Sequence, residues 1–248
     1  MNNFITGLQF LTRIHIARQT EWLPESFGRS VKYFPIIGAI LGMLLFCTYY
    51  VLTEYLPYIG IFLPPHVLTI LLVLLNVLLT GGLTCDGFMD TMDGIFSGRS
   101  KERMLEIMKD SRVGANGVMS FVLLMLLKWS LLMDISPREL PAALFMMPLA
   151  GRFAMVLGIT VFPYARPDGI GKAFAQYAGR KTLYIGSILT LLLAVPFGKQ
   201  AMIGLAAVLV VTVLFSGYVK RKIDGLTGDV YGAITEIAEI ILLFTFLY

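Results

Sequence analysis

The chain has 248 residues, of which 57% are hydrophobic and 15% are charged, and its mean hydropathy is +0.78. Soluble domains carry about 45–50% apolar and about 25% charged residues, so this composition excludes an ordinary soluble protein and predicts an all-α, polytopic integral membrane bundle. The net charge of +4 requires no nucleic-acid partner, and two separated cysteines and two histidines favour neither a disulfide framework nor a zinc site.

The N-terminal residues 1–31 mix apolar and basic side chains and lack the pattern of a cleavable signal peptide, so we expect an interfacial segment there. A spanning helix needs about 20 mainly apolar residues, and the chain offers seven such stretches. They are Tyr33–Leu52, Ile61–Thr80, Gly117–Met133, Pro141–Phe162, Leu183–Phe197, Ala201–Tyr218 and Tyr231–Leu247. Residues 1–248 are therefore expected to form a single membrane-embedded catalytic domain.

Lysines and arginines are concentrated in alternate connections between these stretches. Sixteen of them lie in the N-terminal segment and around residues 99–112, 166–181 and 220–222, whereas the intervening connections hold only Arg138 and Lys199. The positive-inside rule then predicts a cytoplasmic N-terminus, and an odd number of spans puts the C-terminus on the other side. We expect a multi-pass protein of the cell membrane whose active site faces the cytoplasm.

Near the start of the segment Gly81–Arg112, three aspartates, Asp86, Asp90 and Asp93, follow one another at offsets of four and three residues. This spacing puts the three carboxylates on one face of a helix, where like charges repel one another. A hard divalent cation held by oxygen ligands would offset that repulsion, so the sequence predicts a catalytic metal site at these residues. A solvated acidic face is the alternative, although the neighbouring side chains are mainly apolar or small.

A second acidic segment, residues 224–239, leads into the last apolar stretch. Thr227 and Gly228 begin a predicted turn before Asp229, and Glu236 and Glu239 lie three residues apart on one face of the helix that follows. Carboxylates inside an apolar helix are costly, so they are functional candidates by default. A helix-capping role is the alternative for Asp229, but it does not explain the two glutamates.

Basic residues accompany both acidic segments. In Ser100–Arg112 they alternate with apolar residues at helical spacing, so we expect an amphipathic helix at the membrane surface there. Lysine binds phosphate as a point charge and arginine as a planar fork, and a buried arginine in a span needs a carboxylate or phosphate partner. The predicted substrate-binding residues are Arg99, Lys109, Arg112, Arg152, Thr227 and Gly228. Acidic clusters surrounded by cations are typical of phosphoryl or nucleotidyl transfer, in which Mg²⁺ and cations neutralise a diphosphate. Lys109 could equally serve only membrane topology.

Four segments resemble the cobalamin synthase family, the adenosylcobinamide-GDP ribazoletransferases. They are FLTRIHI near the N-terminus, FPIIGAILG at Phe34–Gly42, the run from GGLTCDGFMDTMDG to DSRVGANGV that starts at Gly81, and GLTGDVYGAITEIAEI near the C-terminus. The resemblance covers the chain from end to end, with the segments in the same order.

This resemblance implies an integral membrane enzyme that joins adenosylcobinamide-GDP to α-ribazole or its 5′-phosphate. The products would be GMP and adenosylcobalamin or its phosphate, in the last assembly of the nucleotide loop, with Mg²⁺ as cofactor. It further implies that the metal-binding acids are Asp86, Asp90, Asp93, Asp229, Glu236 and Glu239. Family members commonly have a histidine where this chain has Thr84, so we expect an aspartate, Asp93, rather than a histidine to act as the base.

Other classes fit the pattern less well. A CDP-alcohol phosphatidyltransferase would need an arginine soon after Asp86-Gly87, and an intramembrane prenyltransferase would need an asparagine-initiated motif; neither is present. An ion or metal transporter would need charges near the middle of the membrane and usually an internal repeat. Association with lipid, with further copies of the chain or with other enzymes of nucleotide-loop assembly is compatible with the sequence.

Overall fold

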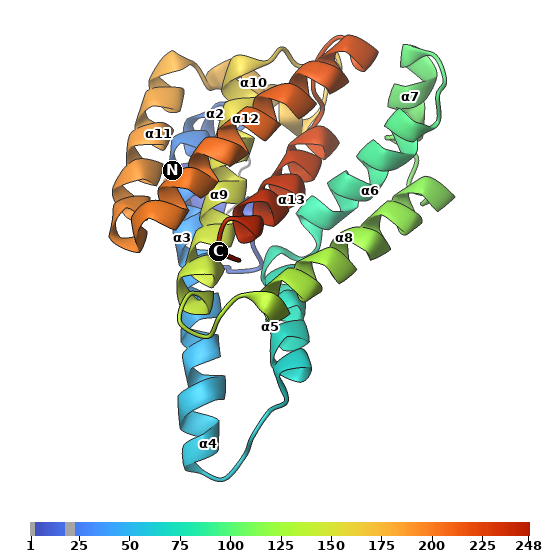
Figure 1. The fold of residues 1–248 in the computed structure, drawn as a ribbon. Helices are drawn as coiled ribbons and strands as arrows, with labels where there is room; N and C mark the ends of the chain where they lie inside the picture. The colour runs from blue at the N-terminus through green and yellow to red at the C-terminus, as the bar shows by residue number, and fades with distance from the viewer. Residues whose placement is uncertain (1–2, 18–22) are drawn as a thin grey trace.

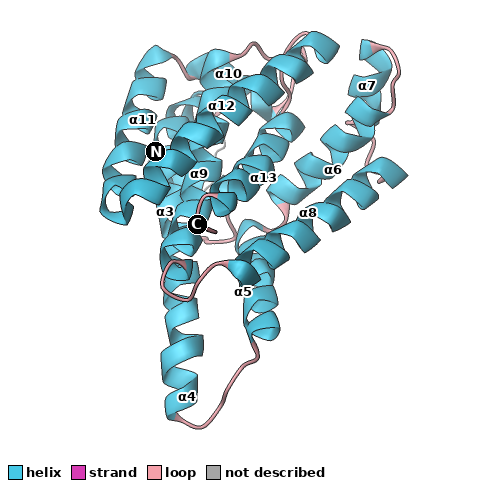
Figure 2. Cartoon of the chain, viewed as in Figure 1, coloured by secondary structure: helices cyan, strands magenta, loops and turns pink. Residues whose placement is uncertain are grey.

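The computed structural model describes residues 3–17 and 23–248, and every regular element in these ranges is a helix (Figures 1 and 2). The first part of the chain forms α1 (Asn3–Leu11), α2 (Pro24–Ser30), a 3₁₀ turn (Val31–Tyr33), α3 (Phe34–Tyr50), a π-helical turn (Val51–Tyr55) and α4 (Leu56–Tyr58). The middle forms α5 (Pro65–Thr80), α6 (Leu83–Phe96), α7 (Lys101–Ile107), α8 (Ala115–Asp134) and α9 (Leu140–Val161). The last part forms α10 (Ile170–Tyr177), α11 (Arg180–Ala194), a 3₁₀ turn (Val195–Phe197), α12 (Gly198–Ile223) and α13 (Gly228–Phe244).

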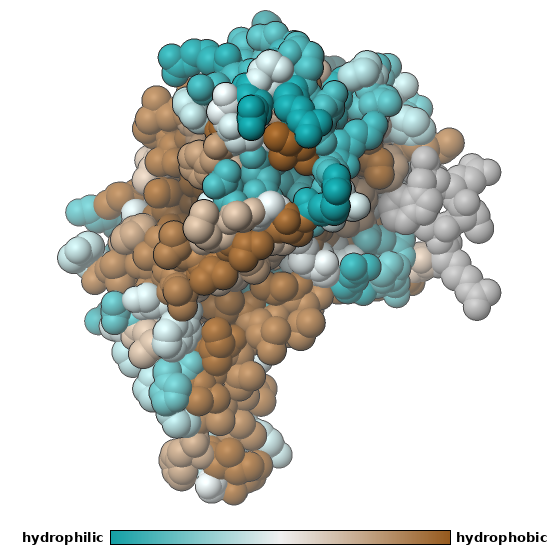
Figure 3. Space-filling view, turned by 90° about the vertical axis from the view of Figure 1, so that its right-hand side faces the viewer, coloured by the Kyte–Doolittle hydropathy of each residue, from teal (hydrophilic) through white to brown (hydrophobic). Residues whose placement is uncertain are grey.

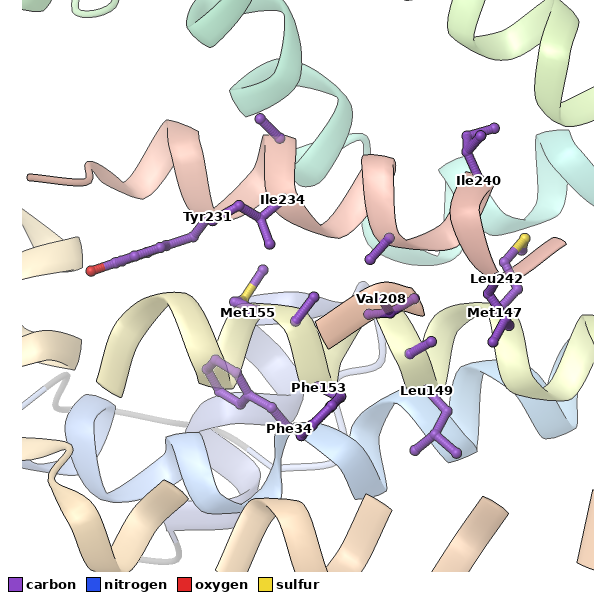
Figure 4. Packing of buried hydrophobic residues seen from close by; sticks show 14 of the residues in the cluster. Phe34, Met147, Leu149, Phe153, Met155, Val208, Tyr231, Ile234, Ile240 and Leu242 are labelled. Carbon is purple, nitrogen blue, oxygen red and sulfur yellow. The ribbon is translucent and has the colours of Figure 1, made fainter. Parts of the chain in front are cut away.

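Helix α9 is the centre of the bundle. Its residues 143–159 are all buried, so other helices surround it on every side. Figure 4 shows α9 side chains packed between α3 on one side and α13 on the other. Two glycines of α3 bring the first pair together: a Cβ at Gly42 would lie 2.2 Å from the Phe145 carbonyl oxygen, and one at Gly38 would lie 2.6 Å from that of Pro148. Small residues allow this close backbone approach, which is how helices commonly associate in membranes.

Helices α5 and α6 form a bent pair with an angle of 90° between them. Two adjacent glycines with positive φ, Gly81 (63°) and Gly82 (72°), make the turn, since side chains other than glycine rarely adopt this conformation. The bend points α6, and with it the aspartates, toward α13 (Figure 1).

Helix α6 packs closely against the first turns of α13. A Cβ at Gly87 would lie 2.7 Å from the Asp229 carbonyl oxygen, and one at Gly232 would lie 3.0 Å from the Thr84 carbonyl oxygen. This approach brings together the two acidic segments, which are separated by more than half of the chain.

Three of the four basic segments predicted to share one face of the membrane lie at one end of the molecule. In Figure 1 the loops around α7 and α10 and the end of α12 all lie at the top, and Figure 3 shows hydrophilic residues gathered at this end above a broad hydrophobic belt. The arrangement is that of a membrane protein with one polar end.

Several of the described helices are long and apolar enough to span a membrane. By length and composition, four helical stretches could cross a membrane, Pro24–Tyr58, Ala115–Asp134, Leu140–Val161 and Arg180–Ile223, and the bent pair of α5 and α6 would add a fifth. The last stretch contains both α11 and α12, between which the chain changes direction at Gly198 (Figure 1). Each of the seven predicted stretches falls on a helix. The count of seven and the cytoplasmic N-terminus stay predictions.

Two surface predictions need refinement. Within residues 1–31, the described part of the N-terminal segment packs into the bundle, because Leu8, Leu11 and Phe27 are buried. Arg18 lies outside the described residues. The amphipathic pattern of Ser100–Arg112 produces the short helix α7, and Met104 within it and Met108 directly after it are buried beneath the exposed charges.

Candidate active site

The three aspartates of α6 have different surroundings. The Asp86 side chain is exposed and Asp90 is half-buried, and no described residue forms an ion pair with either. The charges close enough to act on the Asp90 carboxyl group include Asp86, Asp93, Asp229 and Arg166. These two carboxylates are therefore available to a ligand and lie in a field of further acids.

Asp93 has a structural partner that the sequence did not reveal. One of its carboxylate oxygens accepts a hydrogen bond from the Gly114 N–H at 2.7 Å, and the other accepts one from the Gly117 N–H at 2.8 Å. These donors belong to the start of α8, where N–H groups lack partners within the helix and attract a negative charge. The carboxylate predicted to act as base or metal ligand thus anchors α8 to α6.

Asp93→Asn is expected to lower the free energy of unfolding by about 1–3 kcal/mol, because the amide can accept only one of the two hydrogen bonds. Thermal unfolding of the detergent-solubilised protein measures this loss. Asp134→Asn, at the exposed far end of the same helix, is the matched control and should unfold like the wild type. A variant as stable as the wild type that has lost all turnover would instead support the catalytic role expected from the sequence.

Asp229 lies in the first turn of α13 and pairs with Arg166, whose guanidinium is 2.8 Å from one Asp229 carboxylate oxygen. Thr227 rather than Asp229 caps the helix, since its hydroxyl accepts the Val230 N–H at 3.3 Å. Backbone hydrogen bonds of 2.8 Å from Leu226 to Pro163 and from Ala165 to Leu226 hold the Arg166 loop against this turn. Gly228 is exposed beside Asp229.

Glu236 and Glu239, predicted to bind metal, are buried in a network of ion pairs. The Lys128 Nζ lies 2.6 Å from Glu236 and 2.8 Å from Glu239, and Arg152 lies 3.2 Å from Glu239. Thr84 donates to the other Glu236 oxygen at 2.6 Å, and the Asn76 amide donates to Glu239 at 3.1 Å. Two carboxylates and two cations balance one another, as buried charges must.

Of the predicted substrate-binding cations, two have carboxylate partners and two are exposed. Arg152 is fully buried and pairs with Glu239. Of the two partners that a buried arginine could have, a carboxylate or a phosphate, the structure therefore shows a carboxylate. Arg112 forms hydrogen bonds of 2.7–3.2 Å with Asp110, and these hold the pKa of the Asp110 carboxyl group at about 2. Arg99 and Lys109 are exposed in the connections on either side of α7.

Two cavities meet at Asp86. The smaller, of about 240 Å³, lies among α1, α6, α9, α10 and α13, and its polar lining includes Asp86, Arg166 and Asp229. The larger, of about 570 Å³, lies beside the turn between α5 and α6 and is lined by Arg13 and Asp86 among others. Asp86, Phe10 and Leu83 line both cavities.

The sequence missed two cations at these cavities. In the sequence, Arg166 is only a charge in a turn with Pro167 and Gly169, and Arg13 is only one of the basic residues of the N-terminal segment. Arg13 donates its backbone N–H to Leu79 at 2.8 Å, and its guanidinium fills the space where Gly81 has no side chain. The sequence offers a signal only for Arg166, which stands beside Pro167 and close to Gly169, whereas Arg13 has no glycine or proline near it in the sequence.

The carboxylates fit Mg²⁺ in chemistry but do not form a closed protein cage. Within residues 3–17 and 23–248, no three His, Cys, Asp or Glu side chains converge as a ready-made metal site. Mg²⁺ usually keeps several waters and binds one or two carboxylates together with substrate phosphates, so a partial set of hard oxygen donors is compatible with it. Asp86, Asp90 and Asp229 supply such donors, whereas the two glutamates are already paired.

Comparisons with known proteins show which family the chain resembles. Residues 3–247 match the family model of cobalamin-5-phosphate synthase. Two proteins named adenosylcobinamide-GDP ribazoletransferase, from Alkaliphilus metalliredigens and Desulfitobacterium hafniense, are each 40% identical; the alignments cover 96% and 98% of this chain and 92% and 95% of the relatives. A third of the same name, from Fusobacterium nucleatum, is 36% identical over all of this chain and 97% of its own. No solved structure matches. The chain therefore belongs to the cobalamin synthase family, the adenosylcobinamide-GDP ribazoletransferases.

Proposed function

We propose that this membrane transferase joins adenosylcobinamide-GDP to α-ribazole, or to its 5′-phosphate, and releases GMP. The relatives named for this activity match the chain over nearly its full length. The observation that carries the proposal is the pair of cavities that meet at Asp86, because a transferase must bring an acceptor and a donor to one reacting point.

In the proposed step, a ribose hydroxyl oxygen of the acceptor attacks the donor phosphorus attached to the cobinamide. A new P–O bond forms there, and the bond from that phosphorus to the bridging oxygen of the diphosphate breaks. GMP leaves with the bridging oxygen, and the hydroxyl proton passes to a carboxylate. Asp86 borders both cavities, so we assign it this proton-accepting role in place of Asp93.

Asp90 and Asp229 would hold a Mg²⁺ ion together with the diphosphate of the donor. When bound, the ion would neutralise charge on the diphosphate during transfer. Arg166 keeps Asp229 in place through their ion pair, and Arg13 lines the larger cavity, where it can meet a phosphate. We place this site at the cytoplasmic face of the cell membrane, which the clustering of basic loops at one end supports.

The alternatives are weaker. Lys128, Arg152, Glu236 and Glu239, the charges that a transporter could use as a pathway, are paired with one another and buried in the bundle.

The test is GMP release by the purified protein in liposomes supplied with adenosylcobinamide-GDP and α-ribazole. We expect one GMP for each cobalamin formed, and loss of both when the divalent metal is removed with EDTA. Addition of Mg²⁺ should restore both products. GMP release that does not require α-ribazole, or product formation undiminished by EDTA, would contradict the proposal.

A further inference from the structure

The smaller cavity has the volume and lining of a site for a small apolar ring. Two pairs of aromatic residues form its walls: Phe10 and Phe174, with ring centroids 5.2 Å apart, and Tyr164 and Tyr231, with centroids 6.4 Å apart. Met155 closes the same cavity from α9. A volume of about 240 Å³ lies just below the roughly 300–1,000 Å³ of typical ligand sites, so it admits a bicyclic base and excludes a corrinoid.

We propose that this cavity is the acceptor subsite and that it binds the base of the ribazole nucleoside. The inference rests on the proposed function and adds which cavity receives which substrate. Ribazole carries dimethylbenzimidazole, a flat base whose one free ring nitrogen is its only polar atom. Aromatic walls and the Met155 thioether bind such a ring by stacking and dispersion.

Tyr231 supplies the single polar contact that this base needs. Its side chain is buried, and its hydroxyl group has no hydrogen-bond partner among the described residues. Figure 4 shows the ring extending from α13 with the hydroxyl at its far end, away from Ile234. A buried hydroxyl without a partner is costly, so a ligand atom that accepts its hydrogen bond would be favoured there. The free ring nitrogen of the base is such an atom.

Two other aromatic residues of the cavity wall, Tyr164 and Phe174, are held in position by their neighbours. A Cβ at Gly171 would lie 2.6 Å from the Tyr164 ring, so glycine at this position leaves room for the ring beside the start of α10. Phe174 also contacts Phe27 and Phe34, at centroid distances of 5.4 and 5.6 Å. Such preformed walls avoid much of the cost of ordering side chains on binding.

The position of Asp86 between the two cavities indicates where each substrate lies. With the base in the smaller cavity, the ribose lies toward the end lined by Asp86 and Asp229, and the donor reaches Asp86 from the larger cavity beside Arg13. The base is selected for low polarity, because further ring nitrogens or an amino group would be buried without partners. Free dimethylbenzimidazole should therefore compete with ribazole, whereas adenine should not.

The experiment measures ribazole binding by equilibrium dialysis to the detergent-solubilised protein, without donor or Mg²⁺, and the KM of each substrate in liposomes. Met155→Phe fills the cavity and should raise the KM for ribazole by about tenfold, with the KM for adenosylcobinamide-GDP unchanged. Tyr231→Phe removes one oxygen atom and should weaken ribazole binding by about fivefold to tenfold. Met119→Phe, on the exposed face of α8, is the matched control and should leave both values unchanged.

Thermal unfolding of each variant separates a binding defect from a folding defect, and Tyr231→Phe adds no atoms that the core must accommodate. Wild-type ribazole affinity in both cavity variants would overturn the subsite, while cobalamin formation by the wild type would leave the proposed function intact. A wild-type protein that neither binds ribazole nor releases GMP would overturn both. Equal competition by adenine and dimethylbenzimidazole would overturn the proposed basis of selectivity.

Discussion

Asp86→Asn is expected to reduce the turnover number for cobalamin formation by about 10²–10⁴-fold, because the amide cannot accept the proton of the attacking hydroxyl. The side chain is exposed where the two cavities meet, so the exchange should leave the free energy of unfolding within about 0.5 kcal/mol of the wild type. The measurement is the rate of GMP release at saturating concentrations of both substrates and of Mg²⁺.

Comparing the Asp90→Asn and Asp86→Asn variants distinguishes a role in metal binding from a role in proton transfer. Asp90→Asn should raise the Mg²⁺ concentration needed for half-maximal activity, whereas Asp86→Asn should leave that concentration nearly unchanged and lower only the maximal rate. Asp224→Asn is the matched control, since Asp224 is exposed, forms an ion pair with Lys101 at the surface, and has a φ of 61° that asparagine also adopts readily. Full turnover in Asp86→Asn would refute its role as proton acceptor.

Lys128→Met is expected to lower the free energy of unfolding by about 3–5 kcal/mol, because it leaves two buried carboxylates with one cation. Lys128 bonds to both glutamates and is 1% exposed, so water cannot replace its charge. The measurement is thermal unfolding in detergent. The readout is the reactivity of the Cys85 thiol toward a thiol reagent, because this thiol is buried in the folded protein.

The control variants for this network restore or preserve the charge balance. The double variant Lys128→Met with Glu236→Gln keeps the pair between Arg152 and Glu239, so it should recover part of the lost stability. Lys199→Met, at an exposed position, should change stability by no more than about 0.5 kcal/mol. A single Lys128→Met variant as stable as the wild type would show that the network is not what holds these helices together.

The local pattern of the sequence was enough to find the acidic segments and to place them on helices. The spacing of Asp86, Asp90 and Asp93 correctly indicates one helix, and Thr227-Gly228-Asp229 correctly indicates a helix start. Both follow from short-range geometry, because helical periodicity and capping depend on neighbours within a few residues. The resemblance to the cobalamin synthases was confirmed by the family match over residues 3–247.

The partners of those acids could not be predicted, since they come from distant parts of the chain. Along the sequence, Glu239 lies 111 residues from Lys128 and 87 from Arg152. Asp93 lies 21 residues from Gly114, whose N–H donates a hydrogen bond to it. A single sequence offers no measure of which buried lysine meets which glutamate. The sequence therefore grouped six acids as metal ligands, whereas the bundle divides them into accessible carboxylates, a helix anchor and an ion-pair network.

By itself, the sequence determined that this is a helical membrane protein of one family with two acidic segments, because composition, periodicity and motif order are properties of the chain. Only the tertiary structure decided which acids remain available for chemistry. That choice depends on the 90° bend at Gly81-Gly82 and on the close approach of Gly87 to Asp229, which together bring Asp86 to the point where two cavities meet. The physical reason is that a buried charge must find a partner in space, and the packing of the helices selects that partner.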